Sequence, residues 1–106
     1  MAPALRVALA EGERVLLPTL VVYEWLRGPR VQEEFRAQQA LFPLKDSVAF
    51  GPNEATIAAR LYNEVARPRG REIDLAIAAC ALSWEAWLWT LNERDFADIP
   101  GLKLKR

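Results

Sequence analysis

The chain contains no histidine and a single cysteine, Cys80. Histidine is the commonest general base and the usual zinc ligand in proteins, so its absence excludes mechanisms and zinc sites that depend on it. One cysteine cannot form a disulfide within the chain. This favours a reducing compartment, and we expect the protein in the cytoplasm.

An excess of charge is also lacking, because Lys+Arg and Asp+Glu both number 14 and the formal net charge is +0. Most nucleic-acid-binding proteins carry a basic excess, so any binding to RNA here must depend on a local patch. No apolar run approaches the roughly 18 residues of a membrane-spanning helix, and the N-terminus does not follow the basic-then-apolar pattern of a signal peptide. We therefore expect no membrane association.

What is present fits one globular domain over residues 1–106, since 52% of the residues are hydrophobic and 26% are charged. Short apolar segments predict strands at 14–17, 47–50, 86–90 and 102–104. Apolar periodicity and stop signals predict helices at 2–11, 20–27, 30–41, 54–65 and 73–84. The helix at 73–84 is apolar on every face and is expected to be buried on several sides, whereas the helix at 30–41 has sparse apolar positions and is expected to be exposed with one narrow contact stripe. Strands that alternate with helices predict an α/β fold, in which a parallel sheet is flanked by helices in three α/β/α layers. The four tryptophans lie in apolar segments and are expected in the core.

Three carboxylates lie in or beside apolar segments, where a negative charge is unusual and suggests a bound cation or another partner. Glu24 lies in the apolar segment 17–28, Asp74 opens an uncharged run, and Asp95 follows the apolar segment 86–89. In a parallel sheet, ligands bind beyond the carboxyl ends of the strands. Glu24 and Asp95 each follow a predicted strand, and Asp74 begins a helix antiparallel to the strands. All three are therefore expected at one edge of the sheet.

Clustered carboxylates repel one another unless a cation lies between them or one is protonated. Oxygen ligands without histidine or cysteine suit Mg²⁺ or Mn²⁺ better than zinc. A divalent ion held by Glu24, Asp74 and Asp95 can polarise a phosphate and activate water, which is the chemistry of phosphodiester hydrolysis. Thr90 and Asn92 are candidates for supporting roles at this site.

Each of these residues also has a structural explanation. Asp74 can favour the positive end of a helix dipole, and Asp95 can be a turn aspartate. Glu24 can pair with an arginine such as Arg27, Thr90 can cap the turn that follows it, and Asn92 can orient the loop. The arginines of the segment 67–71 are either a solvated turn or a small patch that contacts phosphate.

Three motifs, taken together, resemble the PIN-domain family, in particular its VapC-type toxin ribonucleases. The segment 17–28 resembles the one that carries the family's helical glutamate, matched by Glu24. The run 74–82 resembles its D-x-x-I-A-A helix, with Asp74 in the acidic position. The segment 90–96 resembles its T-x-N-x-x-D-F motif, matched by Thr90, Asn92 and Asp95.

The resemblance implies a Mg²⁺- or Mn²⁺-dependent endoribonuclease of a toxin–antitoxin system, a hydrolase with catalytic and metal-binding roles for Glu24, Asp74 and Asp95. It also implies RNA as substrate, a cognate antitoxin protein as partner, whose amphipathic segment would lie across the helices of residues 20–41, and a homodimer. Members of the family begin with an apolar strand that ends in an aspartate, and this chain has no match for either. The resemblance therefore implies a PIN-like domain truncated at its N-terminus.

This departure leaves more than one function open. The first is the metal-dependent ribonuclease. The alternative is a catalytically impaired PIN-like binding module that retains antitoxin or dimer contacts. A third is a helix-rich structural domain whose acidic residues never meet.

Overall fold

The computed structural model of the protein describes residues 10–105. Over this range it contains four α-helices and two short 3-10 helices. In chain order these are α2 (Thr19–Leu26), α3 (Gln32–Leu41), η1 (Leu44–Asp46), α4 (Pro52–Glu64), α5 (Glu72–Ser83) and η2 (Glu93–Asp95). The helix predicted at 2–11 falls almost entirely outside the described residues.

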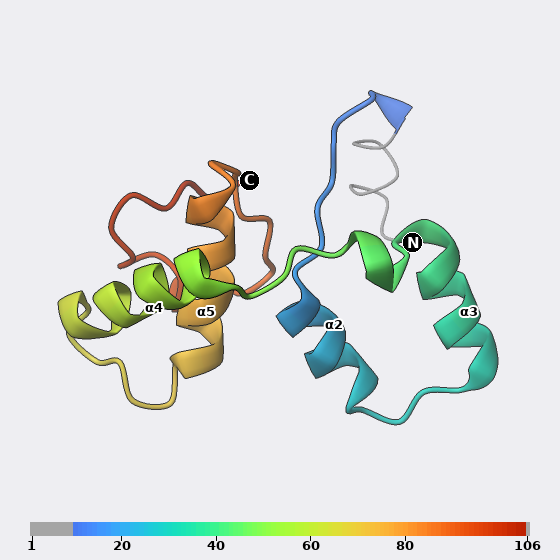
Figure 1. Ribbon diagram of the computed structural model, residues 1–106, viewed down its shortest axis with the longest axis horizontal. Coiled ribbons are helices and arrows are strands. Elements are labelled where there is room, and N and C mark those ends of the chain that lie inside the picture. The colour runs from blue at the N-terminus through green and yellow to red at the C-terminus, as the bar shows by residue number, and fades with distance from the viewer. Residues whose placement is uncertain (1–9, 106) are drawn as a thin grey trace.

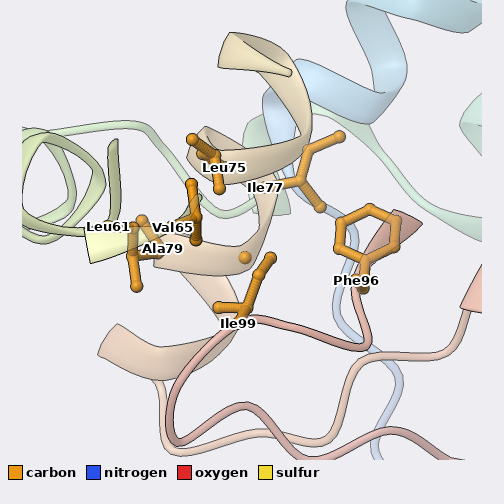
Figure 2. Packing of buried hydrophobic residues seen from close by; sticks show 8 residues of the cluster. Leu61, Val65, Leu75, Ile77, Ala79, Phe96 and Ile99 are labelled. Carbon is orange, nitrogen blue, oxygen red and sulfur yellow. The ribbon is translucent and has the colours of Figure 1, made fainter. Parts of the chain in front are cut away.

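Helix α5 is the centre of the fold. No residue from 75 to 81 exposes more than 9% of its surface, which confirms the prediction of a helix buried on several sides. Helix α4 packs against α5 (Figure 1) through Leu61 and Val65, which are 0% and 8% exposed. Phe96 and Ile99, from the segment after η2, complete this core (Figure 2).

The N-terminus of α4 is bonded to the C-terminus of α5. Pro52 occupies the first position of α4, where a missing N–H costs nothing, and the Gly51 N–H donates to Glu54 Oε1 at 3.0 Å. The Ser83 hydroxyl donates to the Glu54 carboxylate and accepts a bond from Asn53 Nδ2 at 2.9 Å. Hydrogen bonds at this end and apolar packing along the helices fix the two relative to each other.

Helices α2 and α3 lie on the other side of the molecule (Figure 1). Helix α2 contacts α5 and buries Val22, whereas α3 has no buried residue, in agreement with the exposed helix predicted there. Each helix also has apolar side chains in solvent, such as Tyr23 on α2 at 54% exposure and Leu41 on α3 at 46%. None of the helices in the described range is long and apolar enough to cross a membrane.

The predicted parallel sheet is wrong. Residues 10–105 contain no strand and no sheet, and the architecture of this range is helical. The predicted strands instead form two isolated parallel bridges, Pro18 with Val48 and Leu88 with Leu104. In the first bridge, the Thr19 N–H donates to Val48 O and the Val48 N–H donates to Leu17 O, both at 2.9 Å. In the second, the Leu88 N–H donates to Lys103 O and the Lys105 N–H donates to Leu88 O, both at 2.8 Å.

Each bridge is too short to grow into a ladder. The first pair ends at Pro18, because the chain enters α2 at Thr19 and the Pro18 carbonyl already accepts bonds from the first turn of that helix. An isolated pair of extended segments is marginally stable in water, and within residues 10–105 no third segment joins the two pairs into one surface. The helical packing of α4 on α5 therefore supplies the core, and the extended segments only border it.

A candidate acidic site

The three carboxylates predicted to form a site lie on three separate elements. Glu24 is on α2, Asp74 is in the first turn of α5, and Asp95 is the last residue of η2. Burial raises the pKa of the Asp74 carboxyl above its ordinary value, and the charges of Asp95 and then Glu24 raise it further. Residues from distant parts of the sequence thus lie close enough to Asp74 to influence its ionisation.

Packing against the core explains why these residues lie near one another. Asp74 directly precedes the buried run that begins at Leu75, so the position of α5 fixes it. Asp95 directly precedes Phe96, which is 6% exposed and packs in the same core as α5 (Figure 2). On α2, Val21 packs against this core, and Glu24 follows it by one helical turn on the same face.

Arg71 is the cation whose charge acts on Asp74, and sequence analysis did not separate it from the other arginines of its turn. Its Nη2 lies 2.6 Å from Asp98 Oδ1 and its Nη1 2.9 Å from Asp98 Oδ2. Nη2 also donates to the Asp95 carbonyl oxygen at 2.9 Å. The positive charge of Arg71 partly offsets the effects that raise the pKa of Asp74.

Asp98 is the partner of Arg71, a pairing that sequence analysis did not predict. Its two hydrogen bonds with Arg71, followed by the attraction between the charges, lower the pKa of the Asp98 carboxyl. The same hydrogen bonds raise the pKa of the Arg71 guanidinium. The two residues are 27 positions apart, so no periodicity in the sequence could have indicated that they pair.

The two predicted supporting residues shape the loop around Asp95. The Thr90 hydroxyl oxygen accepts a bond from the Asn92 N–H at 3.0 Å, which is the turn-capping role considered for it. The Asn92 carbonyl accepts a bond from the Asp95 N–H at 3.0 Å. An open hollow lies along this loop and is lined by Thr90, Leu91, Asn92, Glu93, Arg94 and Asp95.

Glu24 forms an ion pair with Arg27, which is the structural explanation that the sequence offered for it. Its Oε2 lies 3.7 Å from Arg27 Nη2, and the two side chains are 35% and 59% exposed. An exposed pair at this distance contributes little to stability, typically about 0–1 kcal/mol. The exposed pair with Arg27 thus holds Glu24 only weakly, and the charge of Glu24 still raises the pKa of Asp74.

Carboxylate oxygens are suitable ligands for Mg²⁺ or Mn²⁺. Their spacing is not suitable for one ion, since the described part of the chain has no group of three or more His, Cys, Asp or Glu residues arranged to hold a metal. The acidic site is an electrostatic cluster of Glu24, Asp74 and Asp95, and these three residues are not arranged as the ligand set of a single cation.

A second surface feature lies between α2 and η1. This hollow, here named the α2–η1 hollow, is mainly apolar and is lined by Thr19, Val22, Tyr23, Leu26, Arg27 and Leu44. Tyr23, Leu26 and Leu44 are 54%, 37% and 43% exposed. Apolar side chains that gather on a surface are typical of contacts with another protein segment.

Comparison with known proteins adds no relative, since no family model, no curated protein and no solved structure matches this chain.

Proposed function

We propose that the chain is a metal-dependent endoribonuclease of the toxin–antitoxin type that acts in the cytoplasm. The observation that carries this proposal is the placement of Asp74 at the start of the buried helix α5, near Asp95 and Glu24, whose charges, after burial, raise the pKa of its carboxyl. A fold that brings carboxylates from three distant segments toward one another carries an electrostatic cost, and such a cluster is typical of a functional site. The PIN-like motifs contain the same three residues.

RNA is the substrate class that the surrounding charges support. The overall net charge is +0, so contact with phosphates has to be local. Arg67 and Arg69 are exposed in the turn that leads into α5, a few residues before Asp74. Arginine side chains beside a hydrolytic site hold the phosphate backbone and carry no sequence information.

The donor set is chemically suited to Mg²⁺ or Mn²⁺, which when bound polarises a phosphate and activates water. Because the spacing of the described side chains does not fit one ion, we assign no hydrolytic step to an individual carboxylate. What this chain's own residues do is concentrate negative charge at the start of α5, where a hydrated cation is attracted.

Calorimetric titration with Mn²⁺, together with cleavage of a mixed RNA substrate, tests the proposal. We expect metal-dependent cleavage that Asp74→Asn abolishes and that Glu33→Gln, a change of an exposed carboxylate on α3, leaves intact. Cleavage that persists in EDTA, or that Asp74→Asn does not alter, would show that the acidic cluster is not the catalytic site.

The second candidate is a PIN-like binding module that does not cleave RNA, and the α2–η1 hollow is the observation that favours it. Its partner would be an antitoxin segment with apolar residues on one face of a helix. The two functions differ in one measurement, because a binding module retains partner binding in Asp74→Asn and has no nuclease activity in any metal. Tyr23→Ala would weaken partner binding under either function.

A further inference from the structure

The side chain of Arg71 links the start of α5 to the segment 95–98. It directly precedes α5, and its side chain is 20% exposed. The guanidinium makes three hydrogen bonds shorter than 3.0 Å, two to the Asp98 carboxylate and one to the Asp95 carbonyl, and a longer one of 3.4 Å to the Arg67 carbonyl. One side chain thus bonds to both ends of the segment 95–98.

The geometry of these bonds requires arginine. Asp98 is held by both guanidinium nitrogens in a fork, which a lysine ammonium cannot reproduce. Nη2 of the same group also bonds to the Asp95 backbone, so the fork fixes the orientation of the segment and not only its distance from α5. Phe96 and Ile99 anchor the segment in the core (Figure 2), and Arg71 adds polar attachments at Asp95 and Asp98.

We propose that Arg71 is a positioning residue, which holds the segment 95–98 against the start of α5 and so sets where the Asp95 carboxylate lies relative to Asp74. For its effect on RNA cleavage this inference rests on the proposed function. The structural part does not, because the bonds of Arg71 link the two segments whether or not the site is catalytic.

Amide hydrogen exchange in the metal-free protein tests this inference. The amides to follow are Phe96, which donates to Glu93 O at 3.0 Å, and Ile99, which donates to Phe96 O at 3.3 Å. We expect Arg71→Gln to speed their exchange about fivefold to tenfold, the size typical of losing charge-assisted bonds at a partly exposed position. The amides of Val65 and Leu75, in and beside the α4–α5 core, should be unaffected.

Three further variants separate positioning from charge. Asp98→Asn removes the fork from the other side and should speed exchange as Arg71→Gln does, and the double variant should add little beyond either single change. Arg71→Lys keeps the charge without the fork and should not restore slow exchange. Arg69→Gln removes a charge from the same turn, at an exposed side chain, and should leave the exchange of Phe96 and Ile99 unchanged.

The inference is overturned if Arg71→Gln leaves exchange of Phe96 and Ile99 unchanged, or if Arg71→Lys behaves like the unaltered protein. It is also overturned if Val65 and Leu75 lose protection to the same extent, because Arg71 would then stabilise the whole fold. Titration of each variant with Mn²⁺ is read separately. If no variant, nor the unaltered protein, binds Mn²⁺, the proposed function fails while the exchange result still decides the role of Arg71.

Discussion

Removing the Leu61 side chain should destabilise the protein more than any change on its surface. Leu61 is 0% exposed and lies where α4 packs on α5. Leu61→Ala deletes three carbon atoms, which at about 0.8 kcal/mol each gives roughly 2.4 kcal/mol of lost transfer free energy. The remaining cavity adds to this, so we expect a total loss of about 3–4 kcal/mol in the free energy of unfolding.

Leu91 provides a matched control, because the same substitution at a residue that is 99% exposed removes no buried surface. We expect Leu91→Ala to change the free energy of unfolding by less than about 0.5 kcal/mol. Urea denaturation of both variants, followed by far-ultraviolet circular dichroism, measures the difference. Similar midpoints for Leu61→Ala and Leu91→Ala would show that the α4–α5 interface is not the core that holds the acidic site.

Three further predictions concern single ionisable groups. The pKa of Asp74 is raised in the folded protein, so the free energy of unfolding falls as the pH rises through that pKa. In urea denaturation, Asp74→Asn should therefore be more stable than the unaltered protein at pH 7 and equally stable near pH 3. The pKa of Asp98 is lowered by Arg71, so the stability that this pair contributes is present at neutral pH and is lost as the pH falls through that pKa. Asp98→Asn should therefore lower the free energy of unfolding by up to about 1 kcal/mol at pH 7 and by nothing in acid. Equal losses at both pH values would contradict this. Burial, and then the charge of Glu54, raises the pKa of the Cys80 thiol to about 11. A thiol reagent at pH 8 should therefore label Cys80 slowly in the native protein and rapidly in urea. Rapid labelling of the native protein would refute the burial of Cys80.

The helical part of the fold could be predicted from the sequence because its signals are local. The unbroken apolar run of α5 indicates burial on all sides, and the spacing of Ile57, Leu61 and Val65 indicates one buried face on α4. Both helices form within two residues of the predicted bounds. Exposed α3 could be predicted for the same reason, since its apolar residues are sparse.

The sheet could not be predicted correctly because strand formation depends on a neighbour that a local pattern does not supply. The expectation that the tryptophans lie in the core is wrong for Trp84, which is 48% exposed. It is also wrong in the segment 86–90, which has the composition of a buried strand, because Trp87 is 61% exposed and Trp89 36%. Lys103 and Lys105 lie over their rings, at 5.6 and 5.7 Å from the ring centroids. These tryptophans are partly covered by flexible side chains instead of a packed layer.

Predicting the candidate site had mixed success for the same physical reason. Asp74 and Asp95 stand out in the sequence because each interrupts or borders an apolar segment. The partnership of Arg71 with Asp98 leaves no such mark, because it depends on how the loop after η2 returns to the start of α5. A contact between distant segments is a property of the tertiary fold, and only coordinates reveal it.

The central claim is that Glu24 and Asp95 lie near enough to Asp74 to act on it through space. The most direct test is the pKa of the Asp74 carboxyl, measured by carbon-detected NMR titration in the unaltered protein, in Asp95→Asn and in Glu24→Gln. The claim predicts that the pKa of Asp74 falls in both variants, further in Asp95→Asn, and stays the same in Glu33→Gln. An Asp74 pKa that is the same in all four proteins would contradict the claim.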